Sequence, residues 1–222
     1  MKFIKHPFLL GLVTLVAAGG ADAALLDRGN GLVYDSGLNI TWLQDANLAQ
    51  TLGQDSDGRL SWADANTWAE HLSFAGFDNW RLPALTSSNL CVGSNCSNSE
   101  LAHLYYGELG GVAEQSLSSH HNSNYGLFSQ IKDAVYWLRD QQILVPGYVL
   151  GWGVVTGDGV LSGYQGLFSP NSEFYAWAVH DGDIGEQVGG APGAVPLPGA
   201  SLLFAAGLVV VARASKCLRA HG

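Results

Sequence analysis

Two apolar segments near the ends of the chain limit what it can fold into. The first runs from Phe8 to Ala18, follows two lysines and precedes Ala21-Asp22-Ala23. A positive start, an apolar core and a small-residue cleavage site, here marked by Ala21 and Ala23, make up a secretory signal peptide. We therefore expect residues 1–23 to be removed on export and the mature chain to begin at Ala24.

The second apolar segment lies in the C-terminal tail. Val195, Pro196, Leu197 and Pro198 precede 14 small or apolar residues, 199–212, and positive charges follow at Arg213, Lys216 and Arg219. A stable spanning helix needs roughly 17 to 25 apolar residues, and trailing positive charges stay on the cytoplasmic side of a membrane. The tail therefore predicts a transient association with the inner membrane, with an ordinary short C-terminal anchor as the alternative.

The tail resembles the PEP-CTERM class of bacterial sorting signals, in the variant that begins Val-Pro-Leu-Pro. Leu197 stands where the name-giving motif has Glu. The resemblance implies recognition by an exosortase, a membrane transpeptidase-like protease, and association with exopolysaccharide-producing, biofilm-forming Gram-negative bacteria. The expected organisation is a signal peptide at 1–23, a globular domain at 24–184, a Gly/Ala/Pro-rich spacer at 185–194 and a sorting signal at 195–222.

Charge narrows the classes of partner. Without its two ends the chain keeps five basic and 18 acidic residues, a net charge of −13. Nonspecific binding to nucleic acid depends on clustered Lys and Arg, so we expect no nucleic-acid partner. About 170 residues are consistent with one domain that buries its own core.

Cys91 and Cys96 bracket a short polar loop, whereas Cys217 belongs to the tail. In an oxidising compartment, such a close pair most simply forms a local disulfide. The alternative is a redox or metal-binding pair, although the spacing is not C-x-x-C and no second pair exists to complete a zinc site.

Local patterns predict an α+β fold. Alternating apolar residues on both sides of Asp35-Ser36-Gly37 indicate a hairpin over 32–42 with one buried face. Ser61 and an apolar stripe predict a helix that ends before Gly76. Ser97 with Glu100 has the spacing of a capping box and predicts a second helix, which Gly110-Gly111 ends.

The second half is rich in short β patterns. Strands are expected at Val135–Leu138, Tyr148–Trp152 and Tyr175–Val179, and a loop at Ser116–Tyr125. Between the two expected helices, Trp80-Arg81-Leu82-Pro83 is an extended segment, because the residue before a proline avoids helical angles.

Several of these segments together resemble the Lcl-type C-terminal domain family, named from a bacterial collagen-like adhesin that binds sulfated polysaccharide. They are Gly31–Asp35, Thr41–Leu43, Trp62–Ala65, Asp78–Pro83, Glu100–Leu101, Tyr136–Trp137 and Ala176–Val179 with Gly182. The resemblance implies a twisted antiparallel sheet with two helices and long loops, C-type-lectin-like in outline, and a possible polysaccharide partner. Sulfated glycans need basic residues, and this domain has only Arg28, Arg59, Arg81, Lys132 and Arg139.

Candidate sites are few, and no motif predicts a cofactor. Asp55-Ser56-Asp57-Gly58 resembles the start of a calcium loop, but Asn66 stands where such a loop has a bidentate Glu, which favours a solvated turn. The pairs His120-His121 and His180-Asp181 suggest metal or acid–base chemistry. Neighbouring side chains in an extended segment point apart, however, so surface histidines are the simpler interpretation.

Seven tryptophans are many for this length. An indole face can stack on a sugar ring, yet most of these residues stand at periodic apolar positions typical of a core. Trp152, between Gly151 and Gly153, is the candidate for ligand binding, although packing is the simpler interpretation for it as well.

The sequence thus predicts an exported, noncatalytic surface or matrix protein. A carbohydrate-binding module is one alternative. A secreted hydrolase is another, although no G-x-S-x-G elbow is present.

Overall fold

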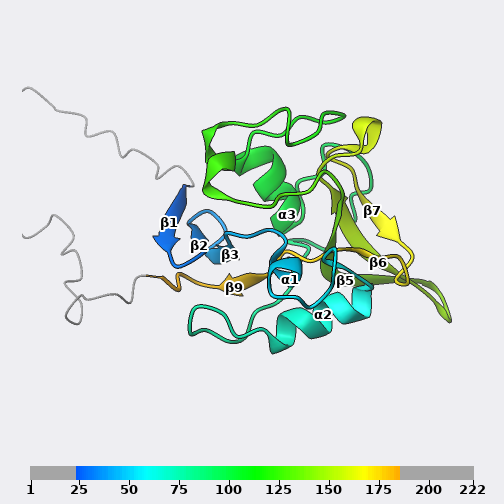
Figure 1. The fold of residues 1–222 in the computed structure, drawn as a ribbon. Helices are drawn as coiled ribbons and strands as arrows, with labels where there is room; N and C mark the ends of the chain where they lie inside the picture. Colours follow the sequence, from blue (N-terminus) through cyan, green and yellow to red (C-terminus); the bar gives the residue numbers. More distant parts are fainter. Residues whose placement is uncertain (1–23, 186–222) are drawn as a thin grey trace, which may run out of the picture. The chain divides into compact units, whose positions relative to one another are not determined.

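The computed structural model describes residues 24–185, which form an α+β unit with two β-sheets (Figure 1). The α+β prediction is confirmed. The signal peptide with Ala21 and Ala23, most of the spacer, and the sorting motif Val195–Pro198 lie outside the described residues.

The first sheet has the order β1-β2-β3-β9 and is antiparallel throughout. Its strands are β1 (Leu25–Gly29), β2 (Leu32–Asp35), β3 (Ile40–Leu43) and β9 (Val179–Asp181). The predicted β2–β3 hairpin is confirmed, and Asp35 accepts hydrogen bonds from the Gly37 and Leu38 amides in its turn. All four residues of β3 are buried, so the expectation of one buried face is wrong. The reason is that β3 lies inside the sheet between β2 and β9, with packed side chains on both faces.

The second sheet has the order β4-β8-β5-β6-β7. Its strands are β4 (Arg59–Leu60), β5 (Val135–Val145), β6 (Tyr148–Val155), β7 (Gln165–Phe168) and β8 (Phe174–Tyr175). β5 and β8 are parallel, whereas the other pairs are antiparallel. The implied single antiparallel sheet is therefore wrong, because the expected strand Tyr175–Val179 divides between the two sheets.

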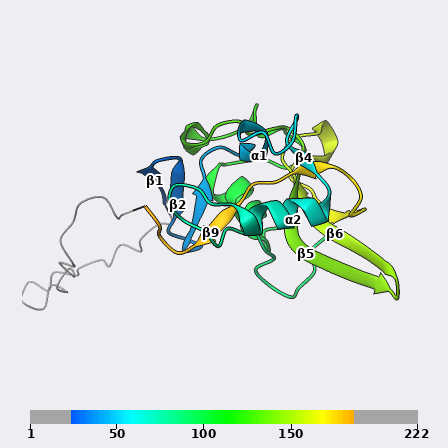
Figure 2. The same ribbon diagram turned by 60° about the horizontal axis from the view of Figure 1, so that its bottom comes forward.

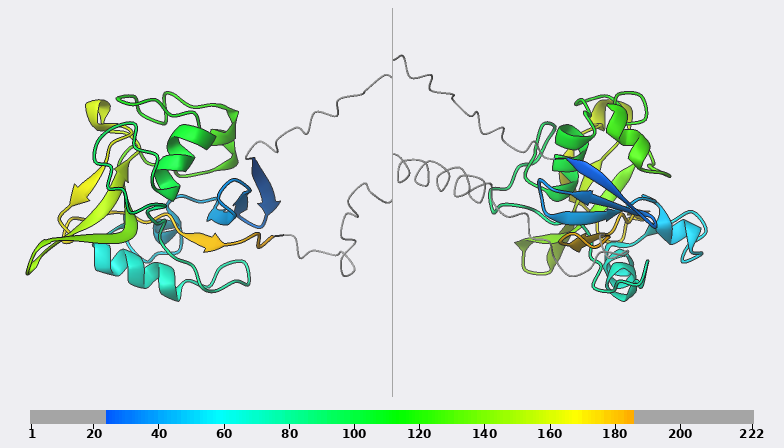
Figure 3. Two further views of the ribbon diagram at one scale, coloured as in Figure 1. Left: turned by 180° about the vertical axis from the view of Figure 1, so that it is seen from behind. Right: turned by 90° about the vertical axis from the view of Figure 1, so that its left-hand side faces the viewer.

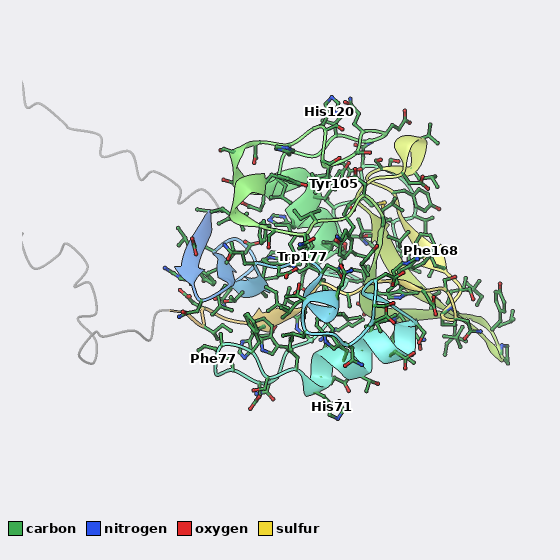
Figure 4. The ribbon with its side chains drawn as sticks, in the orientation of Figure 1. His71, Phe77, Tyr105, His120, Phe168 and Trp177 are labelled. Carbon is green, nitrogen blue, oxygen red and sulfur yellow. A yellow bond between two sulfur atoms is a disulfide. The ribbon has the colours of Figure 1, made fainter. Side chains whose placement is uncertain are left out.

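Trp177 lies where the chain crosses between the sheets and is fully buried near the centre of the domain (Figure 4). Its ring packs against Trp42, Phe128 and Tyr136 at centroid distances of 5.4, 5.1 and 5.7 Å. Its indole N–H donates to the Leu43 carbonyl at 2.7 Å. Both faces of this segment are used in packing, so a pattern of alternating residues could not reveal the crossover.

The helices α2 (Trp62–His71) and α3 (Glu100–His103) lie on opposite sides of the sheets, as Figures 1 and 3 show. α2 (Trp62–His71) begins as predicted, because the Ser61 side chain accepts from the Asp64 amide. α1 (Leu48–Thr51) is a single turn that the sequence did not predict.

α3 (Glu100–His103) continues directly into a π-helical turn, η1 (Leu104–Glu108). Ser99, not Ser97, caps it by accepting from the Ala102 amide at 3.1 Å. The predicted capping box is therefore wrong, because the Glu100 carboxylate is taken by Arg81 and by the Ala84 amide. The predicted stop holds, since Gly110 follows with φ +70°.

β5 and β6 form a long hairpin whose tip projects from the domain (Figure 2). The remaining short elements are η2 (Ser123–Leu127) and η3 (Gly159–Leu161), both 3₁₀ turns. Four exposed apolar residues cover the tip of the hairpin: Ile143, Leu144, Val145 and Tyr148.

Candidate functional site

Trp152, the ligand-binding candidate, is a core residue with only 1% of its surface exposed. The glycines on either side of Trp152 suggested an open strand in the sequence, but in the structure they lie against other residues. A Cβ at Gly151 would come within 2.7 Å of the Trp62 ring, and one at Gly153 within 3.0 Å of the Tyr136 carbonyl. The glycines therefore allow close packing around the strand and do not expose the indole. The surface-ligand hypothesis for Trp152 is wrong.

The calcium-loop candidate is a hydrogen-bonded turn. Asp55 accepts from the Asp57 and Gly58 amides, and Asp57 accepts from the Arg59 side chain at 2.6 and 2.8 Å. The hydrogen bond from Arg59 is the largest cause that lowers the pKa of Asp57, to about 2. Because its carboxylate is already paired with Arg59, Asp57 is part of a surface ion pair and is a poor ligand for a metal cation.

Cys91 and Cys96 form the predicted disulfide. The exposed histidines make local contacts instead of forming one site: His121 stacks on Tyr125, and His71 lies 2.8 Å from the Thr67 carbonyl. Figure 4 shows His71 and His120 at opposite edges of the domain.

Arg81 of the Trp-Arg-Leu-Pro segment is the centre of a half-buried ion-pair network. It donates to both carboxylate oxygens of Glu100, at 2.7 and 2.8 Å, and to Asp181. Burial disfavours the charged guanidinium, but the two carboxylates more than offset that cost and raise the pKa of Arg81. In its backbone, Arg81 also pairs with Val179 of β9. This signature segment therefore has a structural role.

One cavity of about 300 Å³ combines charged and aromatic groups. It is lined from β4, β5, β8 and the segment after β6, by Arg59, Asp133, Val135, Asp158, Glu173, Phe174 and Tyr175 among others. Asp133 is held by the amide and hydroxyl of Ser118. Polar groups beside aromatic rings are a common arrangement in sites for small polar ligands.

A second cavity, of about 370 Å³, lies beside α2. Its walls include Leu52, Leu60, Trp68 and Leu72, with Asp64 and His71 among the polar residues. Trp68 is only 7% exposed, so little of its surface is presented to this space. The cavity near Glu173 offers more charged groups to a ligand.

A third arrangement brings Asp35 together with His103 and Glu108, which lie more than 60 residues later in the sequence. One potential ligand atom from each lies within 4.8 Å of the others. Asp35 is fully buried and Glu108 is 6% exposed. Asp35 Oδ2 and His103 Nε2 are buried without a hydrogen-bond partner in the structure, and His103 Nε2 lies 3.5 Å from Glu108 Oε1.

The backbone explains why this cluster forms. Asp35 ends β2, His103 ends α3 and Glu108 ends η1. Residues five apart in an α-helix lie about 140° apart around the axis. In η1, however, the Leu109 amide donates to the Leu104 carbonyl five residues earlier, which is π-helical geometry. This wider turn brings His103 and Glu108 to one side.

The cluster is an unfavourable place for negative charge. Burial is the main cause that raises the pKa of Glu108, the nearby Asp35 raises it further, and His103 acts in the opposite direction. The sequence analysis missed this cluster. No local signal could have found it, because Asp35 reads as a turn residue and a His/Glu spacing of five does not match an α-helical face.

Within residues 24–185, no helix is both long and apolar enough to cross a membrane. Comparisons with models of protein families, with curated proteins and with solved structures each found no match. The resemblances to the Lcl-type and PEP-CTERM families therefore stay predictions from the sequence.

Proposed function

We propose that this chain is an exported, noncatalytic protein of the cell surface or extracellular matrix. The Cys91–Cys96 disulfide is the observation that carries the proposal. Disulfides persist in oxidising compartments and are rare in the cytosol, so the bridge agrees with an N-terminal export signal. The acidity of the domain suits a soluble particle outside the cell better than a binder of nucleic acid.

The C-terminal tail supplies the sorting step of the proposal. An exosortase-type protease would recognise Val195–Pro198 while the apolar run is held briefly in the inner membrane. The released domain would then join the surface or the exopolysaccharide of a biofilm. The resemblance of the tail to known sorting signals supports this step.

Mass spectrometry of the mature protein from the native host tests the route. We expect an N-terminus at Ala24 and a C-terminus upstream of Arg213. Replacing Pro196 and Pro198 with Ala should leave the tail attached, whereas the matched change Pro192→Ala in the spacer should not. A full-length cytosolic chain with reduced Cys91 and Cys96 would contradict the proposal.

Two features support a noncatalytic role. The disulfide removes both cysteines of the domain as thiol nucleophiles. Arg81, Glu100 and Asp181 are engaged in one structural network. A hydrolase would be revealed by turnover in a substrate screen that is abolished by changing one acid or histidine without loss of fold.

A carbohydrate-binding module is the second candidate, favoured by the cavity near Glu173. Asp158 and Glu173 are exposed acids beside the half-buried rings of Phe174 and Tyr175. Acidic acceptors bind sugar hydroxyls, and ring faces can pack on sugars. This site should favour neutral glycans, because its acids repel sulfated ones.

A panel of neutral and sulfated glycans tests this second candidate. Asp158→Ala with Glu173→Ala should weaken binding of a neutral glycan at least tenfold. Glu114→Ala, which changes an acid outside the cavity, serves as the control. A flat response across the panel would count against the module.

A further inference from the structure

We propose that Asp35, His103 and Glu108 bind one divalent transition-metal ion of the Zn²⁺ class where the end of β2 meets η1. The site is distinct from the cavity near Glu173 and from the Asp55–Gly58 turn. Its three ligands come from two segments of the chain that are more than 60 residues apart. A bound ion would therefore join the N-terminal sheet to the helical segment.

The spacing of the ligand atoms suits such an ion. Zinc bonds to imidazole nitrogen and carboxylate oxygen at roughly 2.0–2.2 Å, so ligand atoms around one ion are about 3–4 Å apart. In the structure these atoms lie within 4.8 Å of one another, and His103 Nε2 is 3.5 Å from Glu108 Oε1. Binding needs inward movements of less than about 1 Å from each side chain.

The unpartnered atoms point to the same conclusion. Asp35 is fully buried, and its Oδ1 is used by the Gly37 and Leu38 amides, whereas Oδ2 has no partner. A buried carboxylate oxygen is costly to leave without a hydrogen bond or a cation. His103 Nε2 is also buried and makes no hydrogen bond, although it lies 3.5 Å from Glu108 Oε1. A cation would satisfy both atoms together.

The surroundings hold two of the ligands in place. The Gly37 and Leu38 amides fix the Asp35 carboxylate. The Asn122 and Asn124 side-chain amides both donate to the Glu108 carbonyl at 2.9 Å, which fixes the end of the π turn. Outer contacts of this kind orient metal ligands.

The donor set favours a transition metal over Ca²⁺ or Mg²⁺. Those hard ions take oxygen ligands, whereas imidazole suits ions such as Zn²⁺. Two carboxylates and a neutral imidazole carry a charge of −2, which a divalent ion neutralises. The His103 side chain is 33% exposed, so the site lies close to the surface of the domain.

Zinc binding to the untagged full-length chain, purified in mild detergent and freed of metal with EDTA, tests the proposal. We expect one Zn²⁺ per chain by elemental analysis and a rise in Tm on adding Zn²⁺. Glu108→Gln and His103→Gln should each weaken binding by at least about tenfold, the usual effect of disturbing a metal site. The double change His120→Gln and His121→Gln removes two exposed imidazoles and should leave binding unchanged.

Zinc that fails to bind or to raise Tm in the wild-type chain would overturn the proposal. Equal binding by Glu108→Gln would do the same. X-ray absorption of the zinc-loaded wild-type chain keeps the test decisive if a variant does not fold. A spectrum with one imidazole and oxygen ligands supports the site, whereas sulfur or several imidazoles would place the ion elsewhere.

Discussion

Arg81 holds both carboxylate oxygens of Glu100 in a two-pronged ion pair, and this contact joins the Trp-Arg-Leu-Pro segment to the first residue of α3. Glu100 also accepts from the Ala84 amide, and Arg81 also reaches Asp181 at the end of β9. The planar guanidinium suits such a bidentate contact better than a lysine ammonium does. One arginine thus connects a loop, a helix and the first sheet.

Removing the Arg81 side chain should destabilise the domain strongly. Arg81→Ala leaves the buried Glu100 carboxylate without its cation, a loss worth about 3–5 kcal/mol for a buried pair. Urea unfolding measures the change. Arg59→Ala, which breaks an exposed ion pair with Asp57, should give no measurable change, and adding Glu100→Gln to Arg81→Ala should recover part of the loss. Equal effects of the two arginine changes would contradict this assignment.

Acid should weaken the contact between Arg81 and Asp181. The hydrogen bond from Arg81 lowers the pKa of Asp181, although burial opposes the shift. The unfolded chain therefore takes up this proton first as pH falls. The stabilising contribution is complete above the unfolded pKa of about 3.9 and is lost as pH falls through the lower folded pKa.

Asp181→Asn should consequently reduce the acid sensitivity of the free energy of unfolding below about pH 4. The effect should be small, because the Asp181 side chain is 77% exposed. Unfolding curves between about pH 2 and pH 7 measure it. Asp78→Asn, at an exposed position, is the control, and identical pH profiles for the two variants would count against the prediction.

Two buried tryptophans offer a matched test of hydrogen bonding in the core. Trp177 donates to the Leu43 carbonyl, whereas Trp152 Nε1 has no partner in the structure. Trp→Phe creates a similar loss of volume at both sites. Trp177→Phe should therefore cost about 1–3 kcal/mol more than Trp152→Phe, measured by urea unfolding. A larger loss at Trp152 would show that its indole N–H has a partner.

The disulfide should contribute about 2 kcal/mol to stability, because it closes a loop whose ends are five residues apart. Replacing Cys91 and Cys96 with Ala should lower the free energy of unfolding by about that amount. A reductant should lower the stability of the wild-type domain and leave the variant unaffected. Equal stability of the oxidised and reduced domains would contradict the prediction.

Local chemistry predicts part of the fold well. The Ser61 cap and the apolar stripe of α2 involve residues that are close together in the sequence, so the helix could be predicted. The same is true of the Asp35-Ser36-Gly37 turn, which joins two neighbouring strands. Glu100 could not be placed from its spacing to Ser97, because its partner Arg81 is 19 residues away.

The remaining failures also arise from distant contacts. Residues 175–179 have the composition of one strand, yet the packing of Trp177 divides them between two sheets. The glycines on either side of Trp152 suggested that its indole could be exposed. In the structure, aromatic rings from other elements fill the space beside these glycines, and the sequence gives no sign of them. The Asp35–His103–Glu108 cluster depends on a π turn, whose wider winding has no recognised local pattern.

The placement of β9 has a mechanical consequence whenever the domain is pulled from its C-terminal side. Tension arriving at residue 185 would pass Asp183 and then reach β9, whose removal is resisted by three residues of β3 and by the Arg81 backbone. The Arg28–Asp183 ion pair adds a clamp between β1 and the segment that follows β9. A pull from that end would therefore load this sheet before it reaches the five-stranded one.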